Sequence, residues 1–195
     1  MEQAIVLRLL LTISLILFTS IAYASIGNVV KHRGTASVER SGEKSVLKKG
    51  SDVEFKDNVR TGDGDIGIKF VDETNVAISP QSSLIIDEFI YDPNSRSGSK
   101  LVMNVALGTV RYASGNIAKL AAQNVDIRTP TARIGVRGTA FSMTVDEVGK
   151  SLVILLPNKD GTVGEISVER TFHPTSLLRH FPFALLHYLY PHKLV

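Results

Sequence analysis

The sequence predicts an all-β, single-domain fold of many short strands, of the β-roll or distorted jelly-roll and barrel kind. Strand-like segments recur at intervals of about eight to twelve residues, the spacing of sandwiches, rolls and barrels, which gives roughly 11 to 14 strands. Glycines are frequent and often stand beside Asp, Asn or Ser, as in tight turns. Glycine and β-branched residues also recur too often for long helices.

The chain has the composition of one globular domain. Of its 195 residues, 44% are hydrophobic and 21% are charged, which is ordinary for a folded protein. The net charge is +3, and aromatic residues do not alternate with the basic ones, so no nucleic-acid partner is expected. There is no cysteine, which excludes thiol catalysis, iron–sulfur clusters and cysteine zinc sites.

Alternating apolar and polar residues place the strands in order along the chain. The turn pair Ser41-Gly42 connects the second strand to the third. Ile66, Ile68 and Phe70 point to one face, as in a half-buried strand. The strands expected before the last hairpins lie at 35–40, 43–47, 53–55, 58–61, 66–71, 75–78, 84–91, 101–107, 109–113 and 117–122, with a helix over 117–123 as the alternative.

Residues 125–143, VDIRTPTARIGVRGTAFSM, are the most informative stretch. Pro130 cannot continue a central ladder because it has no amide hydrogen, so the chain turns there. Gly135 and Gly138 fit positions where the chain bends or another backbone comes close. The stretch therefore predicts strand, tight turn, strand, glycine corner and strand, and a hairpin of 139–145 with 151–156 follows. The apolar residues that alternate along it are Val125, Ile127, Ala132, Ile134, Val136, Ala140 and Phe141.

This stretch resembles the signature of the FecR-domain family, a T-x-T-A-x-x-G-V-R-G-T-x-F run near the end of the domain. The resemblance extends over residues 26–169, although Glu73 and Thr74 replace the family's usual glycine and serine in one turn. It implies an exported sensing or binding domain with no catalytic site, no metal and no cofactor. The signature residues here are Thr129, Thr131, Gly135, Val136, Arg137, Gly138, Thr139 and Phe141.

The N-terminus predicts export. After Arg8, an apolar run ends in Ala22-Tyr23-Ala24, a small-residue cleavage site, so residues 1–24 read as a signal peptide. We expect the domain in the periplasm or outside the cell; an uncleaved inner-membrane anchor is the alternative. Only residues 1–8 precede the apolar run, so we expect none of the cytoplasmic anti-sigma region that full-length ferric-citrate regulators carry.

The C-terminal segment 170–195 differs abruptly in composition and holds four of the five histidines. His173, His180 and His187 repeat at a spacing that would align them on a helix and could bind a metal, but prolines interrupt any such helix. An association or membrane-contact segment, rich in Phe and Tyr, is a second interpretation. The interpretation we favour is a tail outside the domain, from an altered reading frame or a truncated continuation.

Two polar clusters invite a ligand-binding interpretation. Asp63 and Asp65 could bind calcium, but the spacing of a calcium loop is absent, so a solvated hairpin turn is favoured. Arg128, Arg133 and Arg137 could grip a carboxylate or phosphate, yet pairing with Asp126, Asp72 or Asp87 is favoured.

No catalytic constellation is recognisable. His32 is the sole histidine before the tail, and no nucleophile elbow exists, so we expect no enzyme. We expect an envelope sensing or protein-interaction module, with signal transduction as one role for it. It would bind an envelope protein through an exposed strand edge or the polar loop 92–99. A polysaccharide- or surface-binding module and a structural envelope protein without ligand are the alternatives. The residues expected at a partner contact are Tyr91, Asp92, Arg96 and Tyr112.

Overall fold

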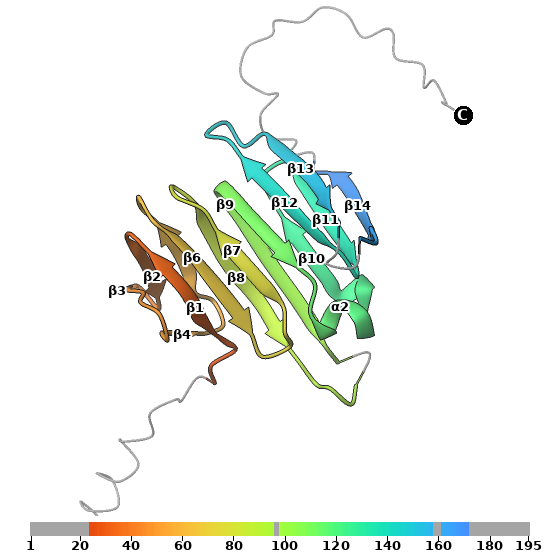
Figure 1. Cartoon of the computed structure of the whole chain (residues 1–195), viewed down its shortest axis with the longest axis horizontal. Coiled ribbons are helices and arrows are strands. Elements are labelled where there is room, and N and C mark those ends of the chain that lie inside the picture. Colours follow the sequence, from red (N-terminus) through yellow and green to blue (C-terminus); the bar gives the residue numbers. More distant parts are fainter. Residues whose placement is uncertain (1–23, 96–97, 158–160, 172–195) are drawn as a thin grey trace, which may run out of the picture.

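The computed structural model describes residues 24–95, 98–157 and 161–171. They form fourteen strands, all joined into one curled sheet, with a short helix and a 3-10 turn at one end (Figure 1). The all-β prediction is therefore confirmed. The elements are β1 Gly27–Arg33, β2 Ala36–Arg40, β3 Glu43–Val46, β4 Asp52–Val53, β5 Asn58–Thr61, β6 Asp65–Phe70, β7 Asn75–Ile78, β8 Ser83–Ile90, β9 Lys100–Ala113, α2 Asn116–Leu120, η1 Ala122–Asn124, β10 Val125–Arg128, β11 Ala132–Arg137, β12 Ala140–Val145, β13 Ser151–Leu156 and β14 Glu165–Arg170.

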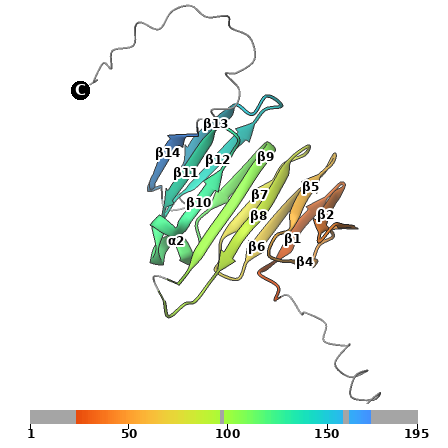
Figure 2. The ribbon, with the colours of Figure 1, turned by 180° about the vertical axis from the view of Figure 1, so that it is seen from behind.

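The sheet folds into two layers that face each other, and the long strand β9 belongs to both (Figures 1 and 2). Its first half pairs with β8 and β10, and its second half pairs with β7 and β12. The front layer thus has the order β4-β1-β6-β7-β9-β12-β13, and the back layer the order β3-β2-β5-β8-β9-β10-β11-β14.

Gly108 stands where β9 passes from one layer to the other. Its φ of +84° lies in the region that favours glycine, and a Cβ at this position would lie 2.1 Å from Ser82 Oγ. The Ser82 hydroxyl accepts a hydrogen bond from the backbone N–H of Thr109 (3.0 Å). A glycine is required here because the corner needs both the unusual φ and the close approach of Ser82.

The core lies between the layers and consists of the side chains that point inward from the strands of both layers. Ile66, Ile68 and Phe70 of β6 are all 1% exposed, which confirms the alternation expected for that strand. Leu84 and Ile86 of β8 are equally buried, as strand periodicity requires. Burial of this apolar surface is the main stabilising term, since the chain has no disulfide.

Local differences from the sequence predictions have physical causes. The strands expected at 101–107 and 109–113 are one strand, because Gly108 turns the ladder without ending it. The segment expected as a strand at 117–122 is helical, and the buried Asp72 accounts for this. The Asp72 carboxylate accepts hydrogen bonds from Thr74 Oγ1 (2.8 Å) and from the backbone N–H of Ile117 (3.2 Å), which anchors the first turn of α2.

The predicted signal peptide and most of the C-terminal segment lie outside the described residues. Of residues 170–195 the structure describes Arg170, which ends β14, and Thr171. The parts of the chain that are described contain no helix with the length and hydropathy of a membrane span.

Candidate functional site

The residues of the 125–143 stretch divide into three groups by the direction in which they point. The first group points into the core, where Phe141 lies against Tyr112 with ring centroids 5.3 Å apart. These side chains explain the apolar half of the signature by packing alone. They are Ala132, Ile134 and Val136 of β11 and Ala140, Phe141 and Met143 of β12.

The second group consists of threonines that tie turns together. Thr129 Oγ1 accepts hydrogen bonds from the backbone N–H of Ala132 (2.9 Å) and from Ser151 Oγ (2.6 Å). Thr131 Oγ1 donates to the carbonyl of Gly149 (2.8 Å). The turn between β10 and β11 is thereby fastened to the start of β13. Thr129 is buried and Thr131 is half-buried, and both hold turns of the fold together.

Thr139 plays the same part at the glycine corner. Its N–H donates to Ser114 Oγ (3.1 Å), and that hydroxyl donates to the Thr139 carbonyl (2.7 Å). Gly138 precedes it with a φ of +58°, and Gly135 faces Ser167 so closely that a Cβ would lie 2.5 Å from the Ser167 hydroxyl. Both glycines occupy the kinds of position that the sequence predicts for them.

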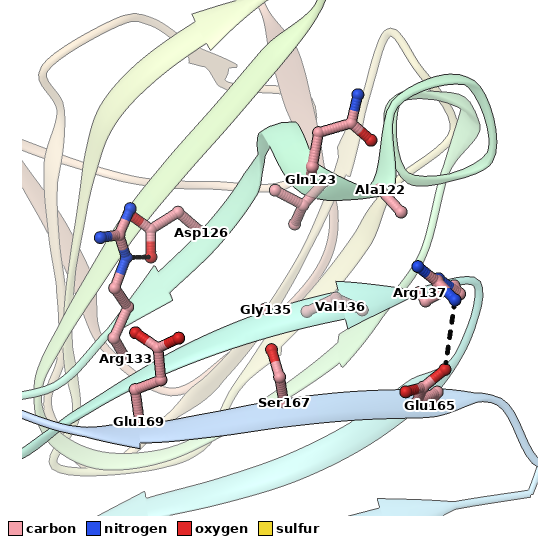
Figure 3. A pocket seen from close by; sticks show the side chains of 11 residues that line it. Ala122, Gln123, Asp126, Arg133, Gly135, Val136, Arg137, Glu165, Ser167 and Glu169 are labelled. Carbon is pink, nitrogen blue, oxygen red and sulfur yellow. Dashed lines mark hydrogen bonds and ion pairs between the residues drawn. The ribbon is translucent and has the colours of Figure 1, made fainter.

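The third group lines a groove on the outer face of the back layer (Figure 3). The groove has a volume of about 460 Å³, lies across β10, β11 and β14, and has η1 along one side. Gly135 leaves its floor without a side chain. The residues that line it are Ala122, Gln123, Val125, Asp126, Arg133, Gly135, Val136, Arg137, Glu165, Ser167 and Glu169.

Charges in and beside the groove are compensated in pairs. Asp126, whose side chain is 10% exposed, accepts from Arg133 Nε (2.8 Å) and Arg128 Nε (2.8 Å). The hydrogen bond to Asp126 and its charge raise the pKa of Arg133 above the ordinary arginine value. Arg137 lies 3.4 Å from Glu165, and both side chains are more than two-thirds exposed. The pairing of Arg128 and Arg133 with Asp126 is the interpretation favoured from the sequence. Arg137 makes only the longer, exposed ion pair with Glu165.

The groove is lined mainly by polar and charged side chains. Ser167 is the one hydroxyl among its lining residues, and no histidine lines it. A nucleophile needs a base within hydrogen-bond reach. Among the described residues, no three histidine, aspartate or glutamate side chains are grouped so that they could hold a metal ion.

Asp63 and Asp65 have separate partners. Asp63 Oδ1 accepts from Thr35 Oγ1 (2.6 Å) and from the Thr35 N–H, which lowers the pKa of this carboxyl below its ordinary value. Asp65 pairs with Lys31 (2.9 Å) and Arg33 (2.6 Å), and chiefly the hydrogen bond from Lys31 lowers its pKa. The two carboxylates thus fasten strand ends, as a hairpin interpretation requires.

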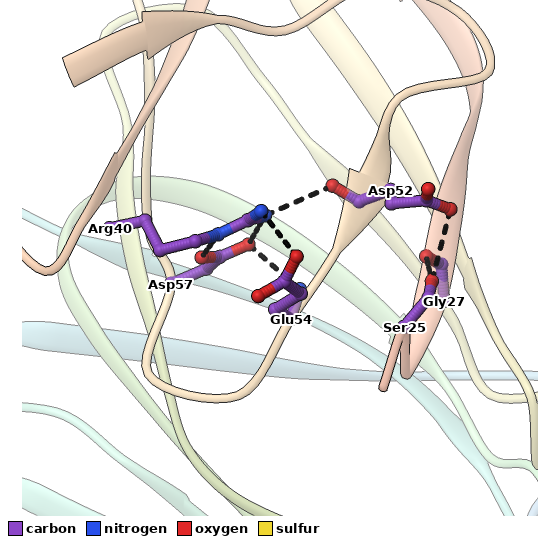
Figure 4. Close-up of polar contacts among 6 residues, drawn as sticks. All are labelled: Ser25, Gly27, Arg40, Asp52, Glu54 and Asp57. Atoms are coloured by element: carbon purple, nitrogen blue, oxygen red, sulfur yellow. Dashed lines mark hydrogen bonds and ion pairs between the residues drawn. The ribbon is translucent and has the colours of Figure 1, made fainter. Parts of the chain in front are cut away.

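A second charged cluster lies at the other end of the domain (Figure 4). Asp57 is fully buried and accepts from Arg40 Nε (2.7 Å) and Nη2 (2.7 Å), while Arg40 Nη1 donates to Glu54 (2.5 Å). Asp57 also accepts from the N–H of Glu54 (2.8 Å). The hydrogen bond to Asp57 is the main reason why the pKa of Arg40 is raised. Every carboxylate in this cluster has a structural role.

The structure places the residues expected at a partner contact in different environments. Tyr112 is 1% exposed and lies in the core, so its expected contact with a partner is wrong. Burial raises the pKa of its hydroxyl. Tyr91 is half-buried against the core, and Asp92 is exposed and accepts from the N–H of Asn94 (2.9 Å) in the loop turn. Arg96 lies outside the described residues.

The most unusual surface is the edge strand β13, which the sequence analysis did not single out. Among the described residues four strands end a layer: β3, β4, β13 and β14. β4 is two residues long, and β3 and β14 carry charged side chains, which are the usual protections of a sheet edge. β13, Ser151–Leu156, has six residues and no charge.

The outer face of β13 is also apolar. Leu152 is 60% exposed and Ile154 is 52% exposed, and Val148 in the preceding turn is exposed as well. Val153 and Leu155 point the other way and pack partly against the core. Among the described residues, none pairs with the outer side of β13, so this edge combines free backbone groups with exposed aliphatic side chains. A signal was present in the sequence: SLVILL is an uncharged run of high β propensity, but its position at an edge depends on tertiary pairing.

Comparison with known families agrees with the signature. The family model described as "FecR protein" matches residues 57–159, which is more than half of the chain. The chain belongs to the FecR family. This is a regulatory and sensing family rather than an enzymatic one. The matched region of this FecR protein runs from β5 to just after β13 and contains the whole signature.

Other comparisons add little for this FecR protein. No curated protein matches it. One solved structure, a "Cell surface anchoring domain", is 37% identical over 31% of this chain and 82% of its own, with a TM-score of 0.30. At that TM-score the match does not establish a shared fold.

Proposed function

We propose that this FecR protein is an exported protein-interaction module of the cell envelope, and that it takes up an extended segment of a partner protein alongside β13. The unprotected edge of β13 is the observation that carries the proposal. Strand addition at such an edge supplies affinity through backbone hydrogen bonds and specificity through alternate side chains. Membership of a sensing family supports a role in envelope signalling.

Export is part of this proposal and rests on residues 1–24 as a signal peptide or inner-membrane anchor. The domain would then be residues 26–169, in the periplasm or outside the cell. Contact with the membrane would come only from residues 1–24, if they remain attached, or from the C-terminal segment.

The polysaccharide-binding alternative has less support. A sugar ring would need an exposed aromatic side chain to pack on, and of the two tyrosines expected at a partner contact Tyr112 is in the core while Tyr91 packs partly against it. The loop 92–99 is also a weaker contact than β13. Its described part is closed on itself, since Ser99 Oγ accepts from the Asp92 N–H (3.1 Å) and donates to the Ser95 carbonyl (3.2 Å).

The test compares two edges of the same domain. Ile154→Lys adds a charge to β13, and Val46→Lys adds the same charge to an exposed aliphatic position on β3. We expect cross-linking in living cells, followed by purification of the tagged full chain, to recover a stoichiometric partner, either an untagged second copy of this chain or a different envelope protein, with the unsubstituted chain and with Val46→Lys. Ile154→Lys should lose it. Equal recovery with both variants would exclude β13, and no partner in any of them would favour a structural envelope protein.

A further inference from the structure

We propose that the partner that pairs with β13 is a second copy of this chain, in an antiparallel two-fold arrangement that joins the front layers of two molecules into one sheet. This inference rests on the proposed function only in that β13 is the contact edge. What carries it is that β13 has no charged side chain and presents Leu152 and Ile154 to solvent, so every antiparallel register of β13 with itself is free of like charges, whereas β3 and β14 both carry charges.

Symmetry restricts such a pair strictly. A two-fold axis that exchanges two antiparallel neighbouring strands lies perpendicular to the sheet, and it passes between one residue and the same residue of the other copy. Val153 and Ile154 are the central positions of β13. Rotation about this axis leaves the outer faces of both copies on the same side of the joined sheet. Leu152 and Ile154 of both copies would therefore form one apolar stripe on that face.

Charge limits self-pairing at β14 and β3 to particular registers, but does not limit it at β13. On β14 a two-fold at Ser167 would place Glu165 opposite Glu169 of the other copy, and on β3 a two-fold at Lys44 would place that lysine opposite itself. Like charges directly opposite each other are destabilising. β13 has no charge, so no register along it brings like charges together.

The nearest described charges do not oppose this pairing. Asp146, Glu147 and Lys150 lie in the turn before β13. In an antiparallel pair the two turns lie at opposite ends of the joined strands, so they stay apart. Pro157 follows the strand directly and, lacking an amide hydrogen, limits how far the pairing can extend.

The absence of cysteine allows a direct test on the full chain. Single cysteines are introduced at each position from Ser151 to Leu156, and at the exposed Ser167 on β14 as the control edge. After mild oxidation, we expect a disulfide-linked dimer that is maximal at Val153→Cys or Ile154→Cys and falls off on either side. Ser167→Cys should give none, because a two-fold at this position still places Glu165 opposite Glu169.

A charge exchange provides a second measurement that does not depend on disulfide formation. Ile154→Lys and Ile154→Glu each place like charges near the axis, so each alone should weaken dimerisation at least about tenfold. An equal mixture of the two should restore a dimer that contains one chain of each, as measured by sedimentation with one chain labelled. Circular dichroism checks that both variants are folded, which is expected because Ile154 is half exposed.

Each other outcome overturns the second-copy proposal in a distinguishable way. A disulfide adduct of β13 with a different envelope protein would leave the proposed function standing and assign the edge to that protein. No adduct, with the cysteine shielded from a water-soluble maleimide, would assign the edge to residues 172–195 of the same chain. No adduct and no shielding would overturn both the second copy and β13 as the contact edge.

Discussion

At the scale of single residues, most polar side chains of this FecR protein complete turns and strand ends. Asp57, Asp72, Thr129 and Thr139 are all buried, and each accepts hydrogen bonds from donors that would otherwise be unsatisfied. The family signature therefore has structural meaning in its threonines and apolar residues. Among the signature residues, Arg137 and Gly138 are exposed to solvent.

The buried carboxylate of Asp57 gives the sharpest prediction at this scale. Asp57→Ala leaves the Arg40 guanidinium and the Glu54 N–H without their partner, so the free energy of unfolding should fall by about 3 kcal/mol. Glu39→Ala removes the exposed partner of Arg60, 4.0 Å away, and should lower it by less than about 0.5 kcal/mol. Urea denaturation measures both, and equal effects would mean that the Arg40 cluster contributes no more than a surface pair.

At the scale of elements, the passage of β9 between the layers depends on one glycine. Gly108→Ala combines a φ of +84° with a contact to Ser82, and it should lower the free energy of unfolding by about 3 kcal/mol. Gly42→Ala is the matched control, because its φ is +85° but its Cβ would meet open space. It should cost about 1 kcal/mol. A similar loss in both variants would show that backbone strain, and not the approach of Ser82, sets the requirement.

The elements also show where sequence patterns suffice. Strand β6 and the β12–β13 hairpin follow from alternation and turn residues, because side chains in a strand alternate with a period of two whatever their partners are. At 117–123 the sequence pattern favours a strand and leaves a helix as the alternative; the helix α2 forms because its first turn is anchored by Asp72, which lies 45 residues before Ile117. Likewise, Tyr112 is buried against Phe141, which lies on the neighbouring strand β12 in space but is far from it in the sequence.

At the scale of the whole molecule, the carboxylates predict how stability varies with pH. The pKa values of Asp63 and Asp65 are lowered in the folded state, by Thr35 and by Lys31 with Arg33 respectively. The unfolded chain then binds more protons, so the stability that these groups contribute is present above the unfolded pKa of about 4 and is lost as the pH falls through the lower folded values.

We therefore expect the midpoint of thermal unfolding to fall as the pH decreases below about 4. The double variant Asp63→Asn with Asp65→Asn should show a shallower decrease over the same range. Calorimetry at several pH values measures this. A slope that is the same with and without the two substitutions would place the acid sensitivity elsewhere in the molecule.

The all-β class, the direction in which most strand residues point and the places where the chain turns can be predicted from local periodicity and turn chemistry, which are properties of short segments, and the family can be predicted from its signature. Tertiary pairing was needed to show that β9 joins both layers, that Tyr112 is buried, and that β13 ends a layer without a charge and, among the described residues, without a strand beside it. The physical reason is that strand pairing is non-local: a segment such as SLVILL has the same pattern in the middle of a sheet as at its edge, and only its neighbours in space decide which of its backbone groups remain free to bind.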